Sequence, residues 1–170
     1  MACIRLFVTA ALLLLLGDLI ATFCYHVPEH VFGKFHSIVH HSPERSFVRY
    51  AIKHRQPIAL IDGFLSAFPY FVFIPLLWQI SPWGVGLGLI LAELHVIWRH
   101  RFFPSQPRPR WVSRLCALLC ITTPERHRIH HQYANQAFGD IFAFYGKPAE
   151  WWLKYLRLLK RRYRNRMMVR

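Results

Sequence analysis

Histidines are the residues of this chain whose type and spacing point most directly to chemistry. The sequence contains 11 of them. Most fall in four short clusters: HVPEH at 26–30, HSIVHH at 36–41, HVIWRH at 95–100 and HRIHH at 127–131. Residues three and four apart share a helix face, so such a cluster can aim several ring nitrogens at one point. Imidazole suits iron, zinc and copper, and the clusters therefore predict a metal site.

The number of clustered histidines predicts more than one metal ion. A structural zinc needs four ligands, whereas the clusters supply enough nitrogens for two ions. His95 and His100 are five residues apart, a poorer match that needs a helix distortion or a helix end. A pH sensor would also use histidine, but it would not need this repeated helical spacing. The predicted ligands are His26, His30, His36, His40, His41, His95, His100, His127, His130 and His131.

Carboxylates are scarce, and three of them are candidates to orient the histidines. Asp18 and Glu93 lie within apolar segments, where ionisable residues are functional candidates. Asp140 follows the last histidine cluster. Metal-bound histidines commonly donate their other ring N–H to a carboxylate. We therefore expect Asp18, Glu93 and Asp140 to accept hydrogen bonds from ligand histidines.

Long apolar segments must position these residues. Residues 6–25 form an apolar run interrupted only by Asp18, and the stretch from Gln56 to Trp98 contains no lysine or arginine. About 20 apolar residues cross a bilayer, and SPWG at 81–84 is a turn signal. The sequence predicts spans at about 6–25, 58–80 and 84–98, an interfacial segment at 111–122 and a basic amphipathic helix at 148–164. The expected fold is a single domain over 1–170, an all-α integral membrane helical bundle.

Composition and charge agree with a membrane protein. The chain is 54% hydrophobic and only 18% charged, yet its net charge is +14, and soluble domains have about 25% charged residues. Residues 26–57 carry five lysines and arginines, the turn at 81–84 none, and residues 99–170 sixteen. The positive-inside rule then predicts a multi-pass protein whose histidine clusters all lie on the cytoplasmic side.

The pattern from Asp18 to Gly139 resembles the fatty acid hydroxylase / sterol desaturase superfamily. The resemblance rests on Asp18, HVPEH, "FHSIVHHSPE" at 35–44 and HRIHH. HVIWRH, followed by Arg101, is also similar to the carotene hydroxylases. The sequence departs from the family where Val27 replaces an arginine and where the second box is one residue longer.

The resemblance implies a membrane-embedded non-haem di-iron oxygenase. Such an enzyme would hold two iron ions at the histidine boxes and would use O2 to hydroxylate or desaturate a membrane lipid: a fatty acyl chain, a sterol or a carotenoid. No nucleotide-binding fingerprint is present. Electrons would therefore come from an external donor, a ferredoxin or a b-type cytochrome. The slot for the lipid could be lined by Phe64, Phe68, Tyr70, Phe71 and Phe73.

Two other classes of function remain. A membrane metal-binding or transport protein without redox chemistry would also use histidines, but transport favours ligands along helix interiors rather than at one end. A membrane-anchored nucleic-acid binder predicts aromatic residues interleaved with lysine and arginine, which only residues 151–164 show. It leaves the histidines unexplained, so we expect no nucleic-acid partner.

Overall fold

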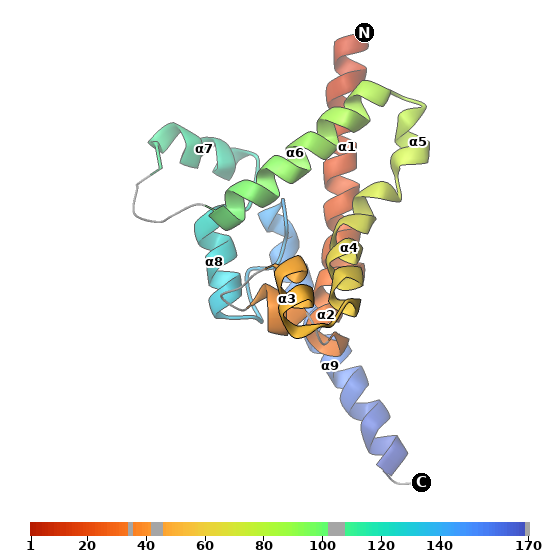
Figure 1. Cartoon of the computed structure of the whole chain (residues 1–170). Coiled ribbons are helices and arrows are strands. Elements are labelled where there is room, and N and C mark those ends of the chain that lie inside the picture. Colours follow the sequence, from red (N-terminus) through yellow and green to blue (C-terminus); the bar gives the residue numbers. More distant parts are fainter. Residues whose placement is uncertain (34–35, 42–45, 102–107, 169–170) are drawn as a thin grey trace.

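The computed structural model describes residues 1–33, 36–41, 46–101 and 108–168. Every regular element in this part of the chain is a helix, which confirms the all-α prediction there; an isolated β-bridge joins Ile121 and Phe142. Figure 1 shows the elements along the chain. They are α1 (Ala2–Ile20), η1 (Ala21–His26), α2 (Val27–Phe32), η2 (His36–His40), α3 (Phe47–His54), α4 (Ile58–Phe71), α5 (Ile74–Trp78), α6 (Pro82–Arg101), α7 (Arg110–Leu118), α8 (Pro124–Gln132), η3 (Ala143–Tyr145) and α9 (Gly146–Met168).

The first three elements form one continuous helix, Ala2–Phe32, which is 31 residues long. It extends past the apolar run at 6–25 because Ala21–His26 continues the winding as a π-helix, with i→i+5 hydrogen bonds. This extension carries the first histidine cluster. The same helix therefore contains an apolar part near the N-terminus and a histidine-bearing part at its other end.

Two helical segments are long and apolar enough to cross a membrane, judged by length and composition: Ala2–Phe32 and Ile58–Trp78. The second is divided into α4 and α5, because Pro75 has no N–H to continue the hydrogen bonding of α4. Helix α6 covers the third predicted span but does not meet the same criterion within the described residues. Its second half carries Glu93, His95 and Arg99, which lower its hydropathy.

Helix α6 crosses α1 at two glycines. A Cβ atom at Gly84 would lie 2.6 Å from the carbonyl oxygen of Leu6 and 2.6 Å from Cβ of Thr9, and a Cβ at Gly88 would lie 2.9 Å from Leu13. Gly86, between them, has open space at the same position. Small residues four apart let two helix backbones approach closely, the arrangement that stabilises helix pairs in membranes. Beyond this crossing the C-terminal half of α6 leaves α1 and packs against α8, which carries the last histidine cluster (Figure 1).

Gly84→Ala is expected to destabilise the protein by about 1–3 kcal/mol, because the added methyl group overpacks a contact with backbone atoms. Gly86→Ala is the matched control and should leave stability unchanged or slightly higher, since alanine favours helix. Thermal unfolding of the detergent-solubilised chain measures both. Equal melting temperatures for the two variants would contradict this close crossing.

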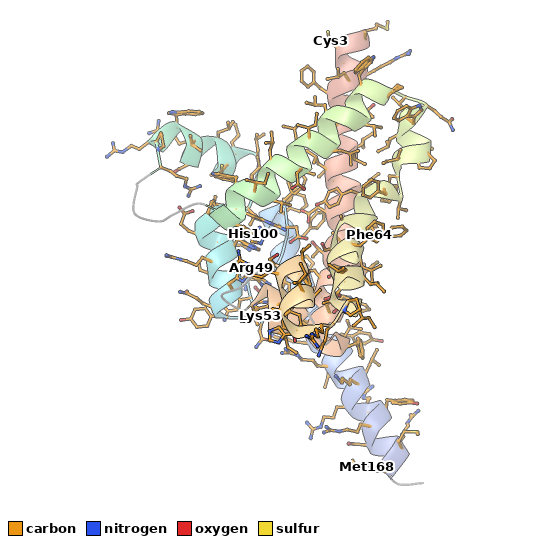
Figure 2. All side chains as sticks on the ribbon, viewed as in Figure 1. Cys3, Arg49, Lys53, Phe64, His100 and Met168 are labelled. Carbon is orange, nitrogen blue, oxygen red and sulfur yellow. The ribbon has the colours of Figure 1, made fainter. Side chains whose placement is uncertain are left out.

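The C-terminal helix packs against the end of the first helix. Leu153 and Leu156 of α9 contact Val27 and Val31 of α2, and the fully buried Phe138 completes this core. The indole N–H of Trp152 donates to the carbonyl of Phe23 at 2.9 Å. The C-terminal end of α9 projects away from the rest of the molecule, with Met168 near its tip (Figures 1 and 2).

Candidate metal centre

One group of histidines gathers where the first helix, η2 and α8 meet. One ring nitrogen from each of His26, His30, His36 and His130 lies within 4.8 Å of those of the others. The Nε2 atoms of His26 and His130 are 2.9 Å apart, although the residues are 104 positions apart in sequence. Two nitrogens that each lie about 2.1 Å from one ion, at right angles, are about 3.0 Å apart. The spacing of these two nitrogens therefore suits a shared metal ion.

The other nitrogens of His26 and His130 fix the tautomers. Nδ1 of His130 lies 2.8 Å from the carbonyl oxygen of Gln136, and Nδ1 of His26 lies 3.2 Å from Oδ1 of Asp140. A carbonyl and a carboxylate oxygen only accept, so both Nδ1 atoms carry the proton. In the neutral rings, both Nε2 atoms then present lone pairs to each other. A cation between them would turn this repulsion into coordination, and the donor set fits a metal ion.

A second group lies beside the first. His100, His127 and His131 place one ring nitrogen each within 4.8 Å of one another. Nε2 of His127 is 3.0 Å from Nε2 of His100 and 3.0 Å from Nε2 of His131. Nδ1–H of His100 donates to the carbonyl of Val96 at 2.8 Å, which again directs Nε2 toward the group. The two groups are adjacent, because the rings of His127 and His130 are 6.1 Å apart.

His41 joins the two groups. Its ring centre lies 4.9 Å from that of His30 in the first group and 5.1 Å from that of His131 in the second. Its Nε2 is 3.4 Å from Nε2 of His30. The predicted ligand His41 is therefore in position to complete either group.

Helix α8 contributes three of these histidines, and its start is fixed by sequence. The side chain of Thr123 accepts a hydrogen bond from the backbone N–H of Arg126, and Pro124 occupies the first turn. Burial lowers the pKa of His127 well below its usual value, and Arg99 lowers it further. Burial also lowers the pKa of His130 well below its usual value, with His26 adding to the effect. Both rings are thus held neutral, the form that binds metal.

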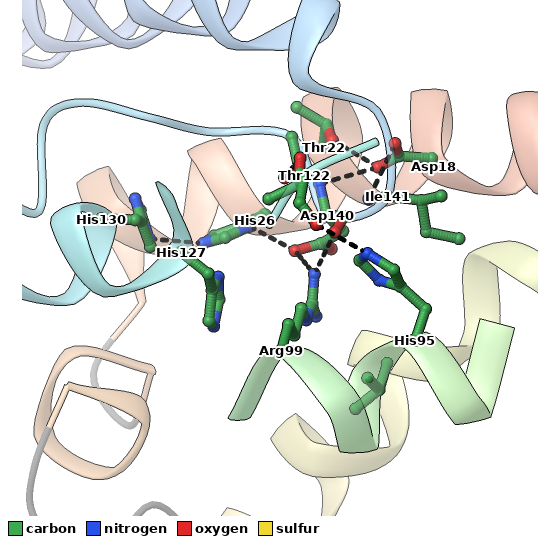
Figure 3. Close-up of polar contacts among 12 residues, drawn as sticks. Asp18, Thr22, His26, His95, Arg99, Thr122, His127, His130, Asp140 and Ile141 are labelled. Atoms are coloured by element: carbon green, nitrogen blue, oxygen red, sulfur yellow. Dashed lines mark hydrogen bonds and ion pairs between the residues drawn. The ribbon is translucent and has the colours of Figure 1, made fainter. Parts of the chain in front are cut away.

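Asp140 orients His26 from a loop that is distant in sequence. Burial alone would raise the pKa of Asp140, but Arg99 and His26 hold it well below its usual range. The Arg99 guanidinium donates to both the side chain and the carbonyl of Asp140 at 2.7 Å (Figure 3). The carboxylate is consequently ionised and accepts from His26, as the sequence analysis expected for this residue.

Asp18 holds the same loop in place. Its buried carboxylate accepts hydrogen bonds from the backbone N–H groups of Asp140, Ile141 and Phe142, at 3.0, 3.0 and 2.6 Å. The hydroxyl of Thr22 donates a fourth at 3.0 Å. The sequence analysis expected Asp18 to accept from a histidine ring. Instead these four groups occupy its oxygens, and Asp18 acts on His26 through the loop that carries Asp140 (Figure 3).

Neither histidine group includes His95 or Glu93, two other predicted site residues. His95 and His100 do not converge, because five residues along an α-helix correspond to about 140° of rotation. Nε2 of His95 instead lies 2.9 Å from the carbonyl of Thr122. Glu93 is exposed and makes no hydrogen bond or ion pair with a described residue. The side chain of His40 lies outside the part of the chain that the structure describes.

A cavity of about 650 Å³ opens beside both histidine groups. His26 and His36 of the first group and His100 of the second form part of its wall. Helices α4 and α6 supply most of the remainder, and the lining also includes Glu93, Arg99 and Asp140. The remaining lining residues are Tyr25, Phe47, Ser66, Ala67, Tyr70, Phe71, Leu89, Ala92 and Val96. Of the aromatic residues expected to line a slot, Tyr70 and Phe71 do so, whereas Phe64 is 61% exposed on α4 (Figure 2).

Sequence reasoning missed two contributors to the site. Arg99 was counted only among the lysines and arginines that set the orientation, although it is the first of them after a long stretch without either, and it lies four residues from His95. An arginine that ends such an apolar stretch is a signal for a paired charge. Gln136 acts through its backbone carbonyl, and a backbone contact leaves no signal in residue type.

The comparisons with known proteins agree with this geometry. A family model described as fatty acid hydroxylase matches residues 10–150, which include every candidate ligand and both aspartates of the site. Neither a curated protein nor a solved structure shows a significant match. The family match confirms the resemblance carried by the histidine boxes.

Proposed function

The chain belongs to the fatty acid hydroxylase family, and from this premise we propose that it is an O2-dependent oxidoreductase that hydroxylates or desaturates a membrane lipid at a di-iron centre. The observation that carries the proposal is the meeting of two adjacent histidine groups beside one cavity. Each group would hold one iron ion, the first through His26, His30, His36 and His130 and the second through His100, His127 and His131. Bound iron would supply the ability to bind and reduce O2, which an unactivated C–H bond requires.

The overall reaction needs electrons and protons from outside. Hydroxylation converts a C–H bond, O2, two electrons and two protons into a C–OH group and water. Desaturation converts two neighbouring C–H bonds, with the same inputs, into a double bond and two waters. We propose an acidic ferredoxin or b-type cytochrome as electron donor, since the chain carries a net charge of +14.

The chain's own residues orient the site and bound the lipid. Oxygens of Asp140, Gln136 and Val96 accept hydrogen bonds from the Nδ1–H groups of His26, His130 and His100, respectively. Each ring thereby keeps Nε2 for the metal. The apolar side chains of the cavity, among them Leu89 and Ala92, would exclude water from an acyl, sterol or carotenoid chain that enters between α4 and α6.

We further propose a multi-pass membrane protein whose metal centre faces the cytoplasm. Two segments suit a membrane by length and composition. Two helices that carry described histidines, α2 and α8, lie toward the end of the first helix that is remote from the N-terminus (Figure 1). The members of both histidine groups fall within residues 26–57 and 99–170. These two ranges carry most of the lysines and arginines, and the positive-inside rule assigns such ranges to the cytoplasmic side.

Metal analysis of the purified full-length chain tests the proposal. We expect two iron ions per chain, with turnover of a lipid when O2 and a reduced donor protein are supplied. One zinc ion and no turnover would instead indicate a metal-binding or transport protein without redox chemistry. A chain that binds no metal would refute both interpretations.

Ala67→Trp is expected to lower lipid turnover about tenfold or more while the iron content stays the same. Ala67 lines the cavity, and an indole there displaces the substrate from the position needed for reaction. Leu65→Trp, on the same helix but outside the lining, is the control. Turnover and bound iron are measured on both variants. Equal turnover by the two would remove this cavity as the lipid site.

A further inference from the structure

A second cavity lies beside the metal centre, and cationic side chains form most of its wall. Its volume is about 320 Å³, and it lies where the end of α2 faces the second half of α9. Its lining consists of His30, Val31, Arg157, Lys160, Arg161 and Arg164. None of these residues lines the larger cavity between α4 and α6. His30 nevertheless belongs to the first metal group, so the two cavities meet different members of one group.

The periodicity of α9 explains why the cavity is basic. Leu153 packs in the core against α2. Positions 157, 160 and 164 follow Leu153 at intervals of four, seven and eleven residues, and these intervals return to the same helix face. The face that is apolar in the first half of α9 is therefore cationic in the second half.

The positive charge of this cavity is not neutralised within the described chain. No aspartate or glutamate is among the lining residues. The Arg157 guanidinium donates to the side-chain oxygen of Asn135 at 2.7 Å, and the Lys160 ammonium donates to the carbonyl of Val31. Arg161 and Arg164 make no hydrogen bond or ion pair with a described residue. Four neighbouring cations repel one another, and a multiply charged anion between them would relieve that repulsion.

We propose that this cavity binds a phosphate group. Arginine presents planar pairs of N–H donors that match phosphate oxygens, and three arginines with one lysine suit a doubly charged phosphate better than a single carboxylate. The group would belong to the headgroup of an anionic phospholipid or to a soluble phosphate ester. A phosphate held here lies against His30 and thus beside the metal centre, but outside the cavity in which the lipid is oxidised.

Binding to the full-length chain in detergent tests the proposal without measuring turnover. The probes are inorganic phosphate, dioctanoyl phosphatidic acid and, as the zwitterionic comparison, dioctanoyl phosphatidylcholine, at constant ionic strength. The test variant is Arg161→Gln with Arg164→Gln. The control, Arg162→Gln with Arg166→Gln, removes the same charge from the same helix at exposed residues outside the lining.

The parent and the control are expected to bind phosphate equally, and the test variant about 100-fold more weakly, since each hydrogen bond to a charged group contributes about tenfold or more. Tighter binding of phosphatidic acid than of inorganic phosphate identifies a phospholipid headgroup. Equal binding of the two identifies a soluble phosphate ester. Equal weakening in both double variants would show diffuse attraction and overturn the proposal. The proposal is overturned equally if none of the three probes binds. Weaker binding of an acidic donor protein to the test variant alone would then identify the cavity as a protein-docking site.

Discussion

His130→Ala is expected to remove metal from the first histidine group and to lower turnover by more than about 100-fold. Its ring contributes one nitrogen to that group and lies 2.9 Å from the ring of His26. Loss of a residue that merely orients a ligand costs about 10–100-fold in metal affinity or activity, and loss of the ligand itself should cost more. Metal analysis and lipid turnover of the purified variant measure both effects.

Two companion variants separate metal loss from misfolding. His131→Ala removes a candidate ligand from the second group, and the His131 side chain is less buried than that of His130. This variant should also abolish turnover while the chain still inserts into membranes. His54→Ala removes an exposed ring on α3 that stacks near Tyr50 and belongs to neither group, so metal content and turnover should match the parent. A His130→Ala chain that keeps the parental metal content would exclude this cluster from the site.

Asp18→Ala is expected to destabilise the protein by about 3 kcal/mol or more and to weaken metal binding. The substitution leaves three backbone N–H groups of the loop 140–142 without their acceptor. A hydrogen bond to a charged group contributes about 1.5–3 kcal/mol. The loop would then no longer fix Asp140 against His26. Thermal unfolding and metal titration of the purified chain measure the two effects.

Thr22→Val is the matched control for Asp18. It removes one donor to the same carboxylate but leaves the three bonds to the loop. We expect a loss of about 1 kcal/mol and unchanged metal affinity. If Asp18→Ala and Thr22→Val proved equally mild, the bonds from Asp18 to the loop would not be what holds the site together.

The histidine boxes could be predicted because their information is local. His127 and His131 are four residues apart on α8. Helical spacing alone brings their rings together, and the two ring centres are 4.6 Å apart. The failure of His95 to join His100 follows from the same rule, since a spacing of five does not share a face. Helix periodicity therefore predicts which histidines of one helix lie together in the site.

The remaining features depend on contacts between distant segments. Asp18 meets a loop more than 120 residues away, and the choice between a ring nitrogen and backbone N–H groups as its partner is decided by the path of that loop. The break between α4 and α5 has a local cause in Pro75, yet prolines are tolerated within membrane helices, so the sequence did not require it. Tertiary geometry settled the partner of Asp18, whereas Pro75 accounts locally for the break.

The wide turns of Ala21–His26 set the rotational phase of the first helix. With i→i+5 hydrogen bonds a π-helix advances only about 80° per residue, against about 100° in an α-helix, so the residues of this segment turn the chain about as far as an α-helical segment one residue shorter. Asp18 precedes the segment, whereas His26 and His30 lie at or beyond its end. In alignments of this family, a one-residue gap between the aspartate and the first histidine box would thus mark chains in which an ordinary α-helix replaces the π-helix and both residues still face one centre.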